Sequence, residues 1–133
     1  MGALVVDTHT AIWYLHMDPS LSRAAEAALD EAFGAGYPVY LPSMCLVELT
    51  YLVEKGRLPA TALDRMRQSV EQASCGFLLA ELDLRVVDSV RLLPRDQVPD
   101  LPDRVIAATS MNLGLPLVTC DSRIRSLPIP TIW

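Results

Sequence analysis

The stretch Ala3-Leu4-Val5-Val6-Asp7-Thr8 is a short apolar run that ends abruptly at an acid. An apolar run without polar alternation is typical of a strand that is buried on both faces, as in a parallel sheet. Ligands of open α/β sheets bind just beyond the carboxyl ends of the strands, so a carboxylate there faces a crevice and not the core. The sequence therefore predicts a buried strand and makes Asp7 the first candidate functional residue.

A second stretch of this kind, Leu115-Pro116-Leu117-Val118-Thr119-Cys120-Asp121, lies near the other end of the chain. It again joins apolar residues to an aspartate. Two buried strands that end in aspartates at matched positions are more than chance composition would give. Asp121 is therefore the second candidate.

The composition is that of a globular protein. The chain has 133 residues, of which 51% are hydrophobic and 20% charged, which suits one domain spanning residues 1–133 with its own core. No apolar run approaches the ~20 residues of a membrane span, and the N-terminus has no signal-type segment, so we expect a soluble, cytoplasmic protein that does not bind membranes. The net charge of −5 argues against a nucleic-acid partner, unless a metal ion neutralises several acids that lie in one site.

The three cysteines, Cys45, Cys75 and Cys120, are widely spaced and include no C-x-x-C pair. Each lies in an apolar context, which is typical of reduced, small core side chains. We therefore expect no redox or zinc role for them.

Helices are expected to alternate with strands, which predicts an α/β fold, a three-layer α/β/α sandwich around a central parallel sheet. Further strands are predicted at residues 38–42, 77–80 and 131–133. The first predicted helix covers residues 8–15, the second is capped by Ser22 and ended by Gly34 and Gly36, and the third is capped by Ser43 and ended by Gly56. The fourth starts with a capping box of Thr61 and Asp64 and carries Leu63, Met66, Val70 and Ala73 at helical spacing. The fifth is opened by Asp83 and closed by Pro94, and the sixth runs from Asp103 to Leu113.

Four acids stand out by their context: Asp7, Glu48, Asp103 and Asp121. Glu48 borders the apolar stripe of its predicted helix, so its carboxylate is partly desolvated and needs a partner. Two carboxylates ~4 Å apart repel by about 4 kcal/mol at an effective dielectric near 20, so converging acids protonate or bind a cation. Oxygen ligands without paired Cys or His suit Mg²⁺ or Mn²⁺, which activate water for phosphodiester hydrolysis.

Each acid taken singly has a simpler interpretation. Asp103 at a helix start is most often a cap, and Glu48 is equally well an ordinary residue at the edge of a helix. The combination of two strand-end acids and two helix acids favours a shared site.

The chain resembles the PIN-domain proteins, and among them the VapC-type toxin ribonucleases of bacterial toxin–antitoxin pairs. The segments that carry the resemblance occur in the family's order, and they are Val5 to His9, Pro42 to Glu48 with Val53 to Leu58, Asp100-Leu101-Pro102-Asp103-Arg104, and Leu117 to Asp121.

The resemblance implies that Asp7, Glu48, Asp103 and Asp121 are the catalytic, metal-binding acids. It implies that the hydroxyls of Thr8 and Thr119 support the acids or the attacking water, and that Asp100 matches an extra acid of many relatives. Those relatives often have D-P-x-D-R, whereas this chain has D-L-P-D-R, so the role of Asp100 stays open.

Several neighbouring side chains have two interpretations. Arg104 contacts a phosphate or pairs with Asp100, and Arg123 and Arg125 either flank an RNA backbone or are solvated surface residues. His9 is expected to be structural and not a general base. Three aromatic residues are interpreted as core or interface rather than as base-stacking platforms: Trp13, Tyr14 and Tyr51.

The sequence predicts an endoribonuclease that cleaves single-stranded or structured RNA with Mg²⁺ or Mn²⁺, as the toxin of a pair with an antitoxin protein and as a homodimer. The surfaces expected to meet a second copy or the antitoxin are Leu46 to Leu58 and Leu63 to Ser74. The alternative is a non-catalytic PIN-like module that binds RNA or protein. A phosphatase or receiver domain also uses strand-end aspartates, but the chain lacks a D-x-D-x-T motif after its first strand.

Overall fold

Five parallel strands form one sheet in the order β3-β2-β1-β4-β5. The computed structural model describes residues 2–72 and 76–133. The strands are β1 (Leu4–Val6), β2 (Val39–Pro42), β3 (Leu78–Ala80), β4 (Leu117–Val118) and β5 (Thr131–Ile132). From β1 the chain builds outward through β2 to β3, then returns to the other side of β1 for β4 and β5. The strand order therefore reverses between β1 and β4, which is where α/β sheets place their ligands.

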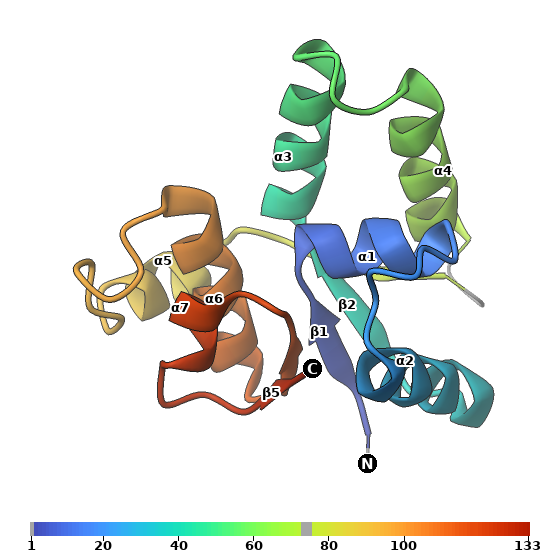
Figure 1. Ribbon diagram of the computed structural model, residues 1–133. Coiled ribbons are helices and arrows are strands. Elements are labelled where there is room, and N and C mark those ends of the chain that lie inside the picture. Colours follow the sequence, from blue (N-terminus) through green and yellow to red (C-terminus); the bar gives the residue numbers. More distant parts are fainter. Residues whose placement is uncertain (1, 73–75) are drawn as a thin grey trace.

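Helices cover the sheet on two sides. In chain order they are α1 (Thr8–Leu15), α2 (Arg23–Ala35), α3 (Ser43–Glu54), α4 (Ala60–Glu71), α5 (Leu84–Val90), α6 (Leu101–Leu113) and α7 (Ser122–Arg125). Figure 1 shows α5, α6 and α7 on one side of β1 and β2, and α2 on the other, while α3 and α4 rise beyond the upper end of the strands. The predicted three-layer sandwich with a central parallel sheet is confirmed.

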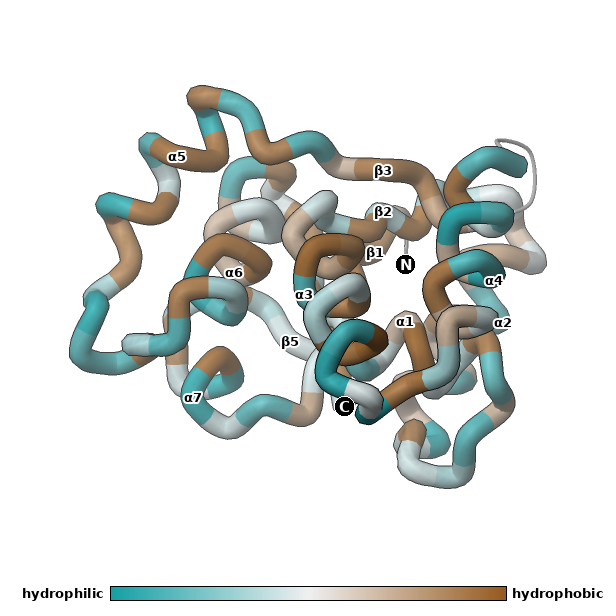
Figure 2. Tube along the Cα trace, turned by 90° about the horizontal axis from the view of Figure 1, so that it is seen from above, coloured by the Kyte–Doolittle hydropathy of each residue, from teal (hydrophilic) through white to brown (hydrophobic). Residues whose placement is uncertain are grey.

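The core forms because the strands contribute apolar side chains to both faces. Val5, Val6 and Leu117 are fully buried, as is Ile106, which α6 supplies from the helical layer. At the edge of the molecule the pattern changes. Figure 2 shows hydrophobic and hydrophilic residues alternating along α5, where Leu84 is exposed.

Three helix ends are capped as predicted. The Ser22 hydroxyl accepts a hydrogen bond from the Ala25 amide at 3.0 Å, and Asp83 caps α5 in the same way through the Val86 amide. Gly36 ends α2 with φ at 77°, a left-handed conformation that glycine adopts without a Cβ penalty.

Three predicted helix starts are wrong. Ser43 is the first residue of α3 and not its cap, because its hydroxyl bonds to the Ala80 carbonyl and the Leu82 amide and so joins α3 to the end of β3. The helix assigned to a Thr61 capping box begins at Ala60, after Pro59, without a side-chain cap.

The third wrong start is Asp103, which lies in the first turn of α6. Asp100 is the cap, and its Oδ2 accepts the Asp103 amide at 3.2 Å. The predicted end of a helix at Pro94 is also wrong, because α5 ends at Val90, four residues earlier.

The cysteine prediction is confirmed for one residue and wrong for another. Cys45 is buried, but Cys120 is exposed, because it follows β4 at the rim of the sheet, where apolar neighbours in sequence no longer mean an apolar environment. Cys75 lies outside the described residues, as do Ala73 and Ser74. In the part of the chain that the structure describes, no helix has the length and apolar character needed to cross a membrane.

Candidate active site

Asp7 lies at the carboxyl end of the central strand, next to the point where the strand order reverses. It is nearly buried and caps α1, with its Oδ1 accepting the Thr10 amide at 2.9 Å. The Thr10 hydroxyl in turn donates to the Val118 carbonyl on β4 at 2.9 Å. The start of α1 is therefore tied to two neighbouring strands, and this fixes the Asp7 carboxylate at the edge of the sheet.

Glu48 reaches the same edge from α3. Thr8 directly follows Asp7, is buried, and its hydroxyl donates to Glu48 Oε1 at 2.6 Å. Desolvation raises the pKa of Glu48, and the hydrogen bond from Thr8 opposes that shift. The charges of Asp100 and Asp7 raise the pKa of Glu48 further, whereas His9 lowers it. Thr8 is thus the side chain that most favours the ionised form of Glu48, with a smaller contribution from His9.

Asp103 is the most strongly perturbed acid. Desolvation raises its pKa from 3.8 to about 7, with further contributions from the charges of Asp121, Asp100, Glu48 and Asp7, in that order. No described hydrogen bond or ion pair reaches its carboxylate. A half-buried acid that repels four other carboxylates is stable as an anion only if a cation compensates the charge.

Asp121 lies two residues beyond Thr119, which follows β4. Its amide donates to the Thr119 hydroxyl at 3.1 Å, and its Oδ1 accepts the amides of Arg123 and Ile124 as the cap of α7. The sequence pattern does not predict α7, because a helix of four residues has no apolar periodicity. Its effect is to fix the direction of the Asp121 carboxylate.

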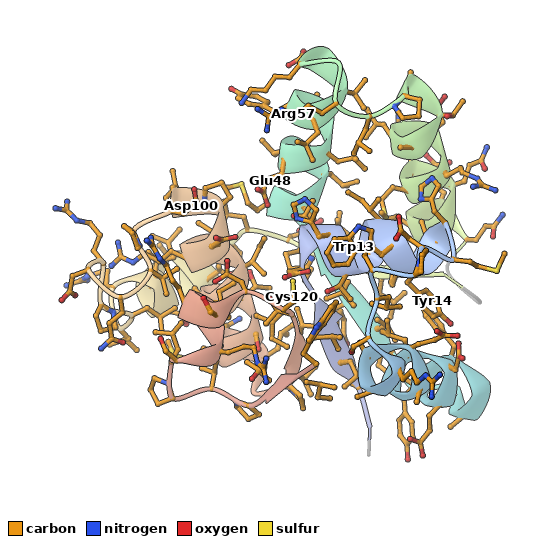
Figure 3. The ribbon with its side chains drawn as sticks, viewed as in Figure 1. Trp13, Tyr14, Glu48, Arg57, Asp100 and Cys120 are labelled. Atoms are coloured by element: carbon orange, nitrogen blue, oxygen red, sulfur yellow. The ribbon has the colours of Figure 1, made fainter. Side chains whose placement is uncertain are left out.

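The structure thus brings together all four predicted acids and Asp100. The charge of each of the other four carboxylates raises the pKa of Asp103, so all of them lie within electrostatic range of it. Figure 3 shows Glu48 on α3 and Asp100 at the start of α6 near one another, above Cys120. Asp100 therefore caps α6 and also lies close enough to Asp103 and Glu48 for its charge to raise their pKa values.

The donor chemistry of this group suits a hard divalent cation. Asp7, Glu48 and Asp121 each use one oxygen in a hydrogen bond with the protein, and the second oxygen of each accepts none from the described residues. As the side chains stand, however, no three His, Cys, Asp or Glu residues within 2–72 and 76–133 are placed to hold one metal ion. Binding would require the free oxygens to move toward each other, which their mutual repulsion opposes until a cation is present.

Arg104 does not pair with Asp100 in the described residues, and its contact with a phosphate stays a prediction. Its Nε and Nη2 both donate to the Leu93 carbonyl, at 3.2 and 2.8 Å, so the guanidinium anchors the segment that precedes α6. In the described residues the ion pair is between Arg67 and Glu71, away from Asp100. Arg123 and Arg125 are exposed, which leaves both of their predicted interpretations open.

Cys120 is a member of this region that the sequence analysis assigned to the core. Its thiol has a raised pKa because of desolvation and the nearby charge of Asp7, with a smaller contribution from Asp121. The signal available in the sequence was its position directly before the acid.

These features define an α/β protein with an acidic site at the switch point of a parallel sheet. Residues 4–130 match the family described as PIN domain, and the chain belongs to that family. It is 29% identical to the ribonuclease VapC22 of Mycobacterium tuberculosis over 138 aligned positions, which cover both chains completely.

Two solved structures show the same fold. One is VapBC2 from Rickettsia felis bound to a DNA fragment from its promoter, with a TM-score of 0.73 at 14% identity, covering 97% of this chain and 96% of that chain. The other is DNA-bound VapBC from Salmonella typhimurium, with a TM-score of 0.69 at 20% identity, covering 98% and 97%.

Proposed function

We propose that this protein is a divalent-metal-dependent endoribonuclease that hydrolyses phosphodiester bonds of single-stranded RNA in the cytoplasm. The observation that carries the proposal is Asp103, whose pKa rises to about 7 because desolvation and four further carboxylates disfavour its ionised form. Such an arrangement is costly for a site that only binds a partner. Membership of the PIN domain family and the end-to-end similarity to a ribonuclease support the same activity.

Asp7, Glu48, Asp103 and Asp121 would hold Mg²⁺ or Mn²⁺, because carboxylate oxygens are the ligands that these ions prefer. When bound, the ion supplies acidified water and polarises a phosphoryl oxygen.

The chain's own residues orient the acids. Thr8 fixes one oxygen of Glu48, and Thr10 fixes one oxygen of Asp7. These hydrogen bonds set the orientation of each carboxylate and so the direction of its second oxygen. Thr119 holds the Asp121 backbone at the start of α7. Removal of such a supporting hydrogen bond typically lowers metal affinity or activity by roughly 10- to 100-fold. Asp100 adds negative charge at the rim of the site.

We further propose that the protein is the toxin of a toxin–antitoxin pair. The solved neighbours from Rickettsia felis and Salmonella typhimurium are VapBC complexes. On α3, Val47 and Tyr51 are 50% and 59% exposed and lie one turn apart, which suits contact with the antitoxin or with a second copy. The large apolar residues of α4, Leu63, Met66 and Val70, are buried or half-buried, so α3 offers the better surface of the two predicted.

The test is cleavage of an end-labelled single-stranded RNA by the wild-type protein with Mn²⁺, the same reaction with EDTA, and the Asp7→Asn variant with Mn²⁺. Cleavage in the first sample alone supports the proposal. Equal behaviour of all three samples, with RNA still bound, would establish the alternative of a non-catalytic PIN-like binding module.

A further inference from the structure

A tryptophan lies level with Asp7 in the register of the sheet. In the sheet register Val6 is opposite Val118, and Val118 is opposite Ile132. The residues that directly follow these three strands are Asp7, Thr119 and Trp133, and the Thr119 amide donates to the Ile132 carbonyl at 3.1 Å. Trp133 is therefore at the carboxyl edge of the sheet, two strand spacings or roughly 10 Å from Asp7.

Trp133 is one end of a row of three rings. Its ring centroid is 5.9 Å from that of Trp13 on α1, and the Trp13 centroid is 5.5 Å from that of His9. The interplanar angles of 53° and 48° show tilted rings, so part of each ring face is left uncovered by its neighbour. His9 is exposed, and both tryptophans are partly exposed. Figure 3 shows Trp13 on α1, on the same side of the molecule as Cys120.

A second aromatic cluster shows what a purely structural role looks like in this protein. Tyr14 stacks on Phe33 and contacts Phe77, which is fully buried, and the Tyr14 hydroxyl donates to Asp30 at 2.7 Å. This cluster has its polar atom satisfied inside the protein. The row of Trp133, Trp13 and His9 differs because it ends in an exposed ring beside an acidic edge.

We propose that His9, Trp13 and Trp133 form a stacking platform for an unpaired base of the RNA, next to the phosphodiester that the acids cut. This inference rests on the proposed function and names how its substrate is held. Bases stack on aromatic faces without hydrogen-bond readout, so the platform selects unpaired nucleotides over paired ones and tolerates different bases. It also compensates for the negative edge, where attraction of the phosphate backbone is weak.

The experiment measures binding and cleavage separately, with an RNA that carries 2-aminopurine at successive positions and a matched RNA with an abasic site at each. For Trp133→Ala we expect about a tenfold weaker Kd, together with a raised KM and a nearly unchanged kcat. The wild type should bind the abasic RNA more weakly by a similar factor. The Trp133→Ala variant should bind the abasic RNA no more weakly than it binds the intact RNA. Trp133→Phe should restore most of the affinity.

Tyr37→Ala is the matched control, because Tyr37 is an exposed aromatic residue at the opposite edge of the sheet, two residues before β2. It should leave Kd unchanged. His9→Ala, at an exposed site, repeats the test should Trp133→Ala lower the melting temperature.

The platform is overturned if Trp133→Ala and His9→Ala bind the RNA as the wild type does, or if their losses add to that of the abasic site. Unchanged RNA binding with weakened binding of a partner protein would assign the row to a protein interface instead. Absence of cleavage in the wild type, with a 2-aminopurine signal that depends on Trp133, would refute the nuclease proposal and leave the stacking site standing.

Discussion

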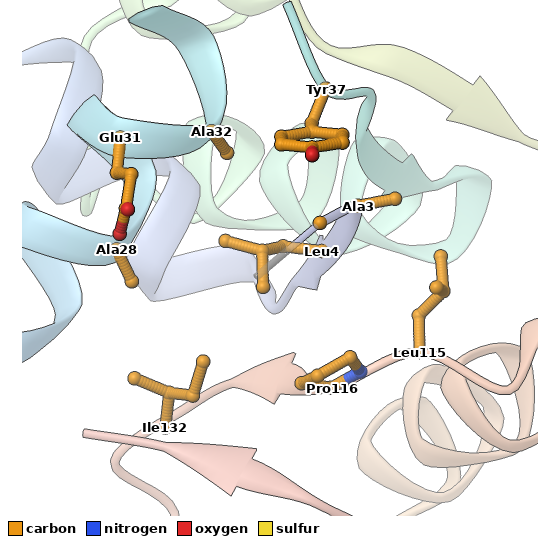
Figure 4. A pocket seen from close by; sticks show the side chains of 10 residues that line it. Ala3, Leu4, Ala28, Glu31, Ala32, Tyr37, Leu115, Pro116 and Ile132 are labelled. Carbon is orange, nitrogen blue, oxygen red and sulfur yellow. The ribbon is translucent and has the colours of Figure 1, made fainter. Parts of the chain in front are cut away.

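The two edges of the sheet are built from the same strands and differ in chemistry. At the carboxyl edge Asp7 and Asp121 follow β1 and β4, and three further acids approach them from α3 and α6. At the opposite edge a cavity of about 350 Å³ lies between α2 and the starts of the strands (Figure 4). Its lining is mostly apolar: Gly2, Ala3, Leu4, Ala28, Glu31, Ala32, Tyr37, Leu115, Pro116 and Ile132.

The presence of a cavity is therefore not enough to identify the active site. The apolar cavity has one carboxylate, Glu31, which lacks a second acid to hold a cation with it. At the carboxyl edge, strand ends and helix starts supply hydroxyls and amides that orient the acids. Raised pKa values of Glu48, Asp103 and Cys120 occur at the carboxyl edge, where function is expected.

The largest effect is predicted for Asp7→Asn. The amide keeps a cap on α1 because asparagine also accepts the Thr10 amide, so the melting temperature should change little. Loss of one carboxylate from the cation site should lower the cleavage rate by roughly 10³-fold, equivalent to about 4 kcal/mol. The check is a single-turnover rate at saturating Mn²⁺ beside a thermal melt. A rate within about threefold of wild type would remove Asp7 from the site.

A smaller effect is predicted for Thr8→Val, which preserves side-chain volume and deletes the hydroxyl that donates to Glu48. Since that hydrogen bond lowers the pKa of Glu48, its loss should raise the pKa and move the acidic limb of the pH–rate profile to higher pH. The rate at neutral pH should fall roughly 10- to 100-fold. Thr8→Ser keeps the hydroxyl and should retain the wild-type profile; a profile that shifts equally in both variants would contradict this role.

The Asp103→Asn variant tests the repulsion among the acids through its effect on the stability of the fold. The folded state raises the pKa of Asp103 from 3.8 to about 7, so its contribution to stability is fully present below about pH 4 and is lost as the pH rises through about 7. Without metal at pH 8, Asp103→Asn should therefore be more stable than wild type by about 1 to 2 kcal/mol, after allowance for solvent screening. Near pH 4 the two proteins should unfold at the same urea concentration.

Added Mg²⁺ should narrow this difference, because a cation stabilises the wild-type carboxylate more than the amide. A stability gap that does not depend on pH would show that Asp103 is not under electrostatic repulsion.

The smallest effect is predicted at the other edge. Glu31→Gln removes the one carboxylate of the apolar cavity, and Glu31 does not contribute to the raised pKa values of Glu48 and Asp103. Cleavage should change by less than about twofold, and the pH–rate profile should keep its shape. A loss comparable to that of Thr8→Val would mean that the two edges are coupled.

The sequence was sufficient where local pattern determines structure. Leu4, Val5 and Val6 directly before Asp7 are all buried, and the strand they form is the centre of the sheet. The same reasoning placed Asp121 beyond β4, because apolar residues without alternation are typical of strands buried on both faces. The predicted matched positions of the two aspartates are wrong, because Asp7 directly follows β1 whereas Asp121 lies three residues after Val118.

Contacts between distant residues were beyond such reasoning. Thr8 and Glu48 are 40 positions apart, and their hydrogen bond exists because α1 and α3 meet above the sheet. In Asp100-Leu101-Pro102-Asp103 either aspartate has the chemistry of a cap, and the backbone geometry selects the first. The contact of Arg104 with the Leu93 carbonyl likewise depends on the path of the loop between α5 and α6.

The most direct test of the account is a crystal structure of the protein soaked in Mn²⁺, with the anomalous difference map calculated near the manganese edge. The account predicts one or more peaks among the carboxylates of Asp7, Glu48, Asp103 and Asp121, with side chains moved toward the ion from their metal-free positions. A map at saturating Mn²⁺ with no peak at this edge, or with its strongest peak elsewhere, would contradict it.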